Sequence, residues 1–215
     1  MNSPYNAEYL GPKWLRTSTT GSPQVRKKDL PRDTMPILAF DPGGTTGWSL
    51  CVLPTQWGTQ SIFTMPQDVI LRSKVHWYHG QIDCILSEDH GVHHMIRLIE
   101  EWPHAAIVVE DFILRPHNHE TSRDLLSPVR ITAKIEHHLW RNNRKMWLQT
   151  PAQAKTVSSD DRLKAWGVYT KEGGLQHARD ADRHVILFLR RCMGVKGTAT
   201  RNVAWPHLFE SKIEV

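Results

Sequence analysis

Short apolar runs alternate with amphipathic stretches along most of the chain. The run 37–40 is apolar and ends at Asp41, and the Pro-Gly-Gly turn that follows predicts a hairpin with a second strand over 47–53. A third strand is expected over 59–64, where Ile and Phe stand among polar residues. The region 75–102 is expected to be mainly helical.

The second half of the chain continues the alternation. The run 105–109 is apolar and ends at Glu110, which predicts a strand. Ser-Pro at 127–128 has the form of a helix start, because serine caps free amides and proline suits the first helical position. This helix is expected to run to about Asn142, and 146–148 predicts a fifth strand. Strands separated by helices indicate an α/β fold.

More helical segments are expected after the last strand. The Thr-Pro-Ala-Gln sequence from Thr150 has the capping-box form of a helix start, and the helical character continues over 160–166 and stops at Gly167. The clearest helix of the sequence covers 177–193, because one of its faces is apolar. We expect this helix to pack on the sheet.

The ends of the chain differ from its middle. Residues 1–35 are rich in Pro and Gly, have no sustained apolar period, and carry three more Lys and Arg than Asp and Glu. They are predicted to form a flexible basic N-terminal arm, followed by one folded domain over 36–193 and a C-terminal tail over 194–215. The arm suits contacts to a nucleic-acid backbone, and a solvated tail is the equal alternative.

Composition limits the classes of protein. The 27 basic against 22 acidic residues give a net charge of +5, which leaves nucleic acid or simple solubility open. The three cysteines are far apart and predict a reducing, cytoplasmic location, and no apolar run approaches the ~20 residues of a membrane span. The histidines at 90, 93 and 94 do not match the spacing of a standard structural zinc site.

Carboxylates at the ends of two apolar strands are the most informative feature. Asp41 and Glu110 each end an apolar run, and a charge beside a core is costly unless it is paired or bound to a metal. In the 177–193 helix, His177 and Asp180 lie on one face, about one turn apart. If the two strands are adjacent and this helix crosses their ends, the four side chains converge.

Three carboxylates with one imidazole predict a site for hard divalent cations. Mg²⁺ or Mn²⁺ suits such donors, and two ions about 3.5 to 4 Å apart can activate water and stabilise the leaving oxygen in phosphodiester cleavage. Taken singly, each residue has another interpretation: Asp41 as a turn residue, Glu110 as a solvent-facing strand end, and His177 as a polar residue at a helix N-terminus.

The segments 37–43, 107–110 and 177–181, together with His184, resemble the RuvC-type Holliday junction resolvases of the RNase H-like superfamily, particularly their phage-encoded relatives. The resemblance covers residues 36–191. It implies an RNase H-like fold, with a mixed five-stranded sheet flanked by helices. It also implies an endonuclease that cleaves branched DNA, most of all Holliday junctions, as a homodimer, in the host cytoplasm if the protein is phage-encoded.

The resemblance also implies a role for each residue of the acidic set. Asp41 would contact both metal ions and Glu110 one of them. His177 and Asp180 would contact the other ion. Many members of the family have aspartate where His177 stands, so the cluster here carries less negative charge.

The helix expected from residue 127 supports a nucleic-acid partner independently. Its basic side chains share one face: Arg130, Lys134, His137 and Arg141. Such a ridge can follow phosphates, and a simply solvated face is the alternative. Arg115 and Lys155 are weaker candidates for phosphate contacts.

Three other functions stay open. A flap- or fork-selective nuclease would use the same fold and residues. A non-catalytic nucleic-acid-binding module would keep the basic ridge, although negative charge beside phosphates gives it no advantage. The Gly-rich hairpin 41–47 also resembles the phosphate-binding loop of actin-like ATPases and sugar kinases, which pair two such domains over a longer chain.

Overall fold

The computed structural model describes residues 15–20, 34–54, 61–64, 67–72, 75–113, 123–169 and 175–209. The strands are β1 (Leu15–Thr20), β2 (Thr34–Asp41), β3 (Thr45–Pro54), β4 (His76–Asp83), β5 (Ala106–Glu110) and β6 (Met146–Gln149). The α-helices are α1 (Gln67–Arg72), α2 (Glu88–Glu101), α3 (Arg123–Arg141), α4 (Pro151–Val157), α5 (Asp160–Trp166), α6 (Gln176–Cys192), α7 (Thr198–Ala204) and α8 (Pro206–Phe209). Short 3-10 helices cover Ser61–Thr64 and Val195–Gly197.

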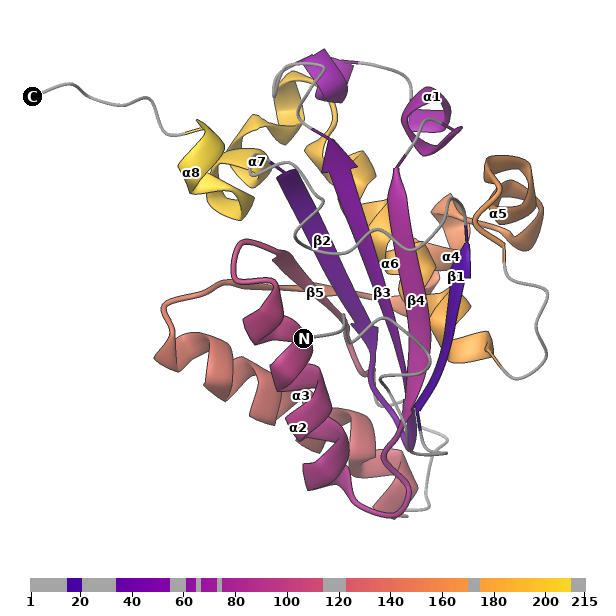
Figure 1. The fold of residues 1–215 in the computed structure, drawn as a ribbon, viewed down its shortest axis with the longest axis vertical. Helices are drawn as coiled ribbons and strands as arrows, with labels where there is room; N and C mark the ends of the chain where they lie inside the picture. The colour runs from indigo at the N-terminus through magenta and orange to yellow at the C-terminus, as the bar shows by residue number, and fades with distance from the viewer. Residues whose placement is uncertain are drawn as a thin grey trace, which may run out of the picture.

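The strands form one mixed sheet in the order β1-β4-β3-β2-β5-β6 (Figure 1). β2 is antiparallel to β3, and β3 to β4, whereas β5 runs parallel to β2 and β6 parallel to β5. The strands β2 to β6 make the mixed five-stranded sheet that was predicted. β1 adds a sixth strand at the β4 edge.

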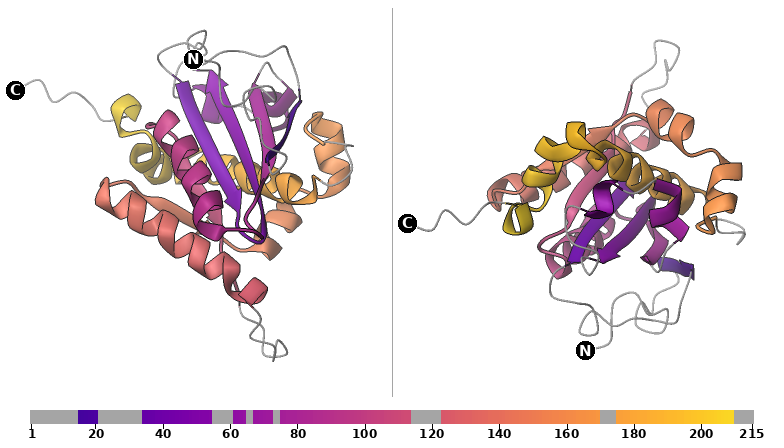
Figure 2. Two further views of the ribbon diagram at one scale, coloured as in Figure 1. Left: turned by 60° about the horizontal axis from the view of Figure 1, so that its bottom comes forward. Right: turned by 90° about the horizontal axis from the view of Figure 1, so that it is seen from above.

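Helices cover both faces of the sheet, with α2 and α3 on one face and α6 on the other (Figures 1 and 2). Ile37 and Ala39 of β2 belong to the core that α6 covers. Leu38 and Phe40 belong to the core formed with α2 and α3. Because successive side chains of a strand point to opposite faces, odd-numbered positions of β2 face α6.

Two predictions in the first half of the chain were wrong. The strand that pairs with β3 on its outer side is β4, and not the predicted strand over 59–64. Residues 61–64 form a 3-10 helix instead. The region 75–102 is therefore part strand, with α2 beginning only after its N-cap Ser87. β4 is buried on both faces, so its residues lack the apolar and polar alternation that marks a half-exposed strand.

The later elements follow the sequence more closely. The capping box of Thr150 and Gln153 starts α4, and Gly167 ends α5 in the left-handed conformation at φ 75°. α3 begins at Arg123 rather than at residue 127, so Pro128 lies inside the helix. Its buried stripe is Ile131, Ile135 and Leu139.

The expected tail was wrong for residues 194–209, which continue in helices that pack on the core. Trp205 is fully buried, and its ring nitrogen donates to the backbone oxygen of Pro36 at 3.1 Å. Of the predicted arm, residues 15–20 form β1 and residues 34–35 begin β2, and the rest lies outside the described residues. Within the described ranges, no helix combines the length and apolarity of a membrane span.

Candidate active site

The ends of β2 and β5 bring Asp41 and Glu110 side by side. The two strands are parallel and adjacent, with Phe40 paired to Val109, so the next residue of each strand is a carboxylate. Both carboxylates are in phase with the residues that face α6, such as Ala39. The two strands are therefore adjacent, which meets the first condition for the four side chains to converge.

A close approach of α6 to β3 carries His177 and Asp180 to the same place. A Cβ on Gly47 would lie 1.9 Å from the backbone oxygen of His177, so any larger residue would push the helix start away. The side chain of Gln81 accepts the backbone N–H of His177 at 3.0 Å. This contact satisfies one of the free amides at the start of the helix.

Each member of the acidic set has a side-chain partner. His177 Nδ1 donates to Asp41 Oδ2 at 2.9 Å. His184 Nε2 donates to Glu110 Oε2 at 2.7 Å. Asp180 accepts from Arg183, which also donates to an Asp on α5. The structure therefore brings the four predicted residues close enough for their charges to interact, and each of the three carboxylates is hydrogen-bonded to a side chain of α6.

Burial and mutual repulsion characterise the site. Desolvation raises the pKa of Asp41, which is 7% exposed, and the charges of Glu110 and Asp180 raise it further, against the hydrogen bond from His177. The same hydrogen bond raises the pKa of His177, partly offset by burial. The charged form of Asp41 is therefore disfavoured, mainly by burial and further by the two neighbouring carboxylates.

The side chains of the acidic set are of the types that bind hard divalent cations. Carboxylate oxygens with one imidazole are ligands suited to Mg²⁺ or Mn²⁺. In the part of the chain that the structure describes, however, no three His, Cys, Asp or Glu side chains are gathered as one metal-binding group. A cation held by Asp41, Glu110 and Asp180 would replace part of their contacts to histidine and arginine.

Sequence patterns assigned His184 no role beyond its place in the motif. Its ring is fully buried, with Nδ1 lying 3.0 Å from Gln149 Oε1 on the side opposite Glu110. Gln149 pairs with Glu110 in the sheet. The available signal was spacing, because His184 follows Asp180 by four residues and so shares its helix face.

Asp182 on α6 was also missed. It is fully buried, and it accepts from Ser49 Oγ at 2.7 Å, from Trp77 Nε1 at 2.8 Å and from His79 Nδ1 at 2.8 Å. These donors lie on β3 and β4. The cluster ties α6 to the sheet and so holds the helix that carries the site.

The predicted nucleic-acid contacts are not assembled into one free ridge. Arg130 donates to Glu88 at 2.8 Å and Lys134 to Asp89 at 2.5 Å, so both connect α3 to α2. Their role in DNA binding stays a prediction. The ion pairs escaped sequence reasoning because they join residues more than forty positions apart.

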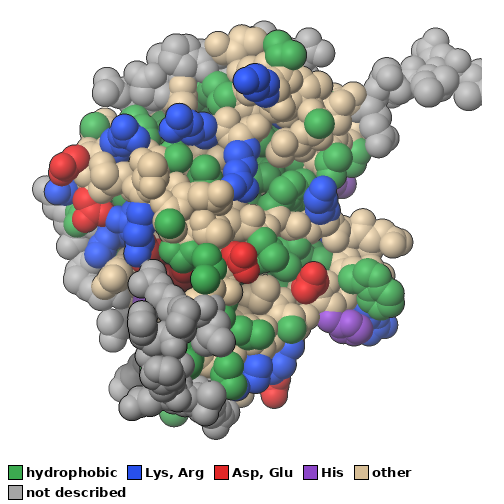
Figure 3. Space-filling view, turned by 180° about the vertical axis from the view of Figure 1, so that it is seen from behind, with side chains coloured by type: hydrophobic (Ala, Val, Ile, Leu, Met, Phe, Trp, Pro, Cys, Tyr) green, Lys and Arg blue, Asp and Glu red, His purple; other side chains and the backbone are tan. Residues whose placement is uncertain are grey.

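The other predicted nucleic-acid contacts are described only in part. His137 is exposed and stacks on Trp140, and Arg141 and Lys155 are exposed. Arg115 lies outside the described residues. On the rear face, Lys and Arg side chains are scattered among other residues rather than gathered in one stripe (Figure 3).

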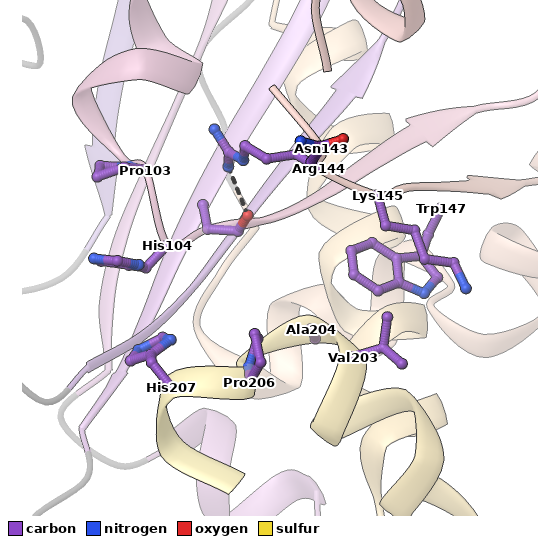
Figure 4. A pocket seen from close by; sticks show the side chains of 11 residues that line it. Pro103, His104, Asn143, Arg144, Lys145, Trp147, Val203, Ala204, Pro206 and His207 are labelled. Carbon is purple, nitrogen blue, oxygen red and sulfur yellow. Dashed lines mark hydrogen bonds between the residues drawn. The ribbon is translucent and has the colours of Figure 1, made fainter. Parts of the chain in front are cut away.

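A separate hollow of about 320 Å³ lies at the opposite ends of β5 and β6, the ends where these strands begin (Figure 4). His104, Lys145 and His207 contribute to its lining, and Arg144 donates to the backbone oxygen of Ala105 at 2.9 Å. None of the residues described as lining it is Asp or Glu. The hollow is therefore distinct from the acidic site.

Three comparisons with known proteins were made, and one of them found similar solved structures. No protein-family model matches the chain, and no curated protein matches its sequence. The chain is similar to T. thermophilus RuvC in complex with a Holliday junction substrate, with 14% identity and a TM-score of 0.48, covering 74% of this chain and 94% of that chain. A second Thermus thermophilus RuvC structure has 13% identity and a TM-score of 0.49, with 74% and 95% covered.

Proposed function

We propose that this chain is a divalent-metal-dependent endonuclease that cleaves branched DNA, with the Holliday junction as its main substrate. The observation that carries the proposal is the meeting of Asp41, Glu110, His177 and Asp180 where two parallel strands end under α6. Asp41 is buried there beside two like charges. A cluster of this kind is stabilised by cations, and cations beside carboxylates are suited to phosphodiester hydrolysis.

In the proposed reaction, water attacks the scissile phosphorus and the bond to the leaving oxygen breaks. Two Mg²⁺ or Mn²⁺ ions, when bound, supply activation of the water and charge stabilisation of the leaving oxygen. Asp41 would hold both ions, Glu110 would hold one of them, and Asp180 with His177 would hold the other. The buried ring of His184 fixes the orientation of the Glu110 carboxylate.

We propose branched DNA as the substrate because these four residues resemble the RuvC-type motif. The exposed basic groups are the proposed contacts to phosphate. Arg141 and Lys155 are exposed, and Arg130 and Lys134 could contact phosphate by exchanging their partners on α2. We place the activity in the cytoplasm, where the three buried free cysteines would stay reduced.

We further propose that the protein acts as a homodimer, because a symmetric double cut needs two acidic sites and each chain supplies one. The outer face of α3 is a suitable interface. Leu126, Val129 and Trp140 are exposed there and lie within about 60° of one another around the helix, opposite its buried stripe. Light scattering of Trp140→Glu should show a smaller mass than the wild type; an unchanged mass would exclude this face.

One contact disfavours the kinase alternative. The side chain of Thr46 accepts the backbone N–H of Gly43 at 3.2 Å and donates to its carbonyl oxygen at 3.1 Å. The hairpin therefore closes on itself, and this amide of the loop is engaged before any phosphate arrives.

The test is cleavage of synthetic four-way, forked and linear DNA, with and without Mg²⁺ or Mn²⁺. We expect metal-dependent cutting of the four-way substrate and weak cutting of linear duplex. Asp180→Asn should abolish cleavage and keep DNA binding, and the matched control Asp160→Asn, which alters the other acceptor of Arg183, should keep both. Equal cutting of all three DNAs would remove junction selectivity, fork-preferred cutting would favour the flap or fork enzyme, and ATP hydrolysis without nicking would favour the kinase.

A further inference from the structure

Two histidines one helical turn apart on α2 face each other. His90 and His94 occupy positions i and i+4, and their Nε2 atoms are 3.3 Å apart. The two rings meet edge to face, with centroids 4.8 Å apart. The helix that carries them is 14 residues long and is capped at its start by Ser87, so the backbone holds the spacing of the pair.

The separation of the two nitrogens matches one edge of a metal coordination tetrahedron. Zinc binds imidazole nitrogen at about 2.0–2.1 Å, and two ligands at the tetrahedral angle are then about 3.4 Å apart. A single ion above the midpoint of the two Nε2 atoms would therefore be at bonding distance from both. No change of backbone conformation is needed.

The surroundings keep one of the rings neutral. Burial lowers the pKa of His94 to about 4, and the neighbouring His90, His93 and Arg97 contribute to the same shift. A neutral imidazole has the free lone pair that a metal requires. His90 is exposed and His94 is half-buried, so an ion from solvent can reach the pair.

We propose that His90 and His94 form a binding site for a transition-metal dication of the Zn²⁺, Ni²⁺ or Cu²⁺ type. Imidazole suits these ions better than Mg²⁺, which prefers oxygen. Within the described ranges, no third His, Cys, Asp or Glu completes a metal-binding group, so the proposed site is a two-histidine chelate of those residues. The site goes beyond the proposed nuclease function and uses none of its residues.

His93 provides the matched control. It is exposed on the same turn, and its ring lies 5.6 Å from that of His94, but it has no facing nitrogen contact of the kind that joins His90 and His94. Replacing it changes the number of histidines on α2 and leaves the proposed chelate intact.

The experiment measures the affinity of the full chain for Zn²⁺ by competition with a chromophoric chelator. A His177→Gln background is used so that the acidic site contributes less to the signal. Adding His90→Gln or His94→Gln should weaken the tightest Zn²⁺ site at least about tenfold, whereas His93→Gln should change its affinity less than about twofold. A Zn²⁺ concentration about 100-fold above Kd should raise the Tm by about 5 °C, and each of the first two substitutions should remove that rise.

The proposal would be overturned if all three substitutions weakened Zn²⁺ binding equally, or if His90→Gln and His94→Gln did not weaken it. Circular dichroism of each variant confirms that α2 still forms. Cleavage of four-way DNA in Mg²⁺ by His90→Gln and His94→Gln in the otherwise wild-type chain should equal that of the wild type. The metal site and the nuclease function can therefore fail independently.

Discussion

Asp41 and Asp182 are two buried carboxylates on the α6 side of the same sheet, and their surroundings differ. Asp182 is fully buried and accepts three hydrogen bonds from Ser49, Trp77 and His79. Asp41 accepts one from His177 and is repelled by two neighbouring carboxylates. The first is satisfied by the protein alone, which marks a structural role. The second lies beside two like charges, as the proposed metal site requires.

The largest effect that tests this contrast is expected from Asp41→Asn. We expect cleavage to fall by at least about 10³-fold, because the amide cannot hold two cations. The free energy of unfolding should stay within about 1 kcal/mol of the wild type or rise, because the raised pKa of Asp41 means that folding disfavours its charge. Cleavage assays and denaturant titration check this, and substantial residual activity would contradict it.

Asp182→Asn is the reciprocal substitution. An amide nitrogen would face donors that now bind a carboxylate, so the free energy of unfolding should fall by about 3 kcal/mol. Cleavage by the folded fraction should remain within about tenfold of the wild type. If this variant were as stable as the wild type but inactive, the division between structural and functional carboxylate would fail.

His184→Gln sharpens the comparison, with His79→Gln as its control. Both histidines are fully buried and donate to a carboxylate, at 2.7 Å to Glu110 and 2.8 Å to Asp182. Loss of the contact to Glu110 should raise the Mn²⁺ concentration needed for half-maximal cleavage about 10- to 100-fold. His79→Gln should lower stability and leave that concentration unchanged, and equal effects of both on the Mn²⁺ requirement would refute a positioning role for His184.

The smallest expected effect is on stability and comes from a third carboxylate, Glu88, which is paired with Arg130. The hydrogen bond from Arg130 lowers the pKa of Glu88 to about 2, below the ordinary value of 4.5. The resulting stability is present above about pH 4.5 and is lost as the pH falls toward 2. Glu88→Gln should cost about 0.5–1 kcal/mol at pH 7, a difference that shrinks toward pH 2.

The control for Glu88 is Asp89→Asn, which alters an exposed pair with Lys134 and should have almost no effect. Chemical denaturation of the three proteins between pH 2 and pH 7 provides the measurement. A constant Glu88→Gln difference over that range would show that charge pairing with Arg130 does not stabilise α2 against α3.

The sequence predicted the two strands of the candidate site better than the rest of the sheet. β2 and β5 are short apolar runs ending in a carboxylate, so their pattern predicted both strands and the carboxylates at their ends. β4 was missed because His79 and Gln81 are polar, yet buried under α6. Their burial depends on Asp182 and on the start of α6, about a hundred residues away.

The same limit applies to the site. The four acidic and imidazole residues could be predicted because a helix face and strand ends restrict where they lie. Their partners could not, since Arg183, His184 and Gln149 meet them only once α6 is packed across the sheet. The ion pairs from α3 to α2 could not be predicted either, because the periodicity of a helix contains no information about which other helix it packs against.

Anomalous diffraction from crystals grown with Mn²⁺ tests the central claim most directly. We predict manganese between the carboxylates of Asp41, Glu110 and Asp180, with the His177 contact to Asp41 exchanged for the metal. Manganese absent from this position at saturating concentration, with Asp41 still bonded to His177 and Glu110 to His184, would contradict the assignment of a metal-dependent nuclease.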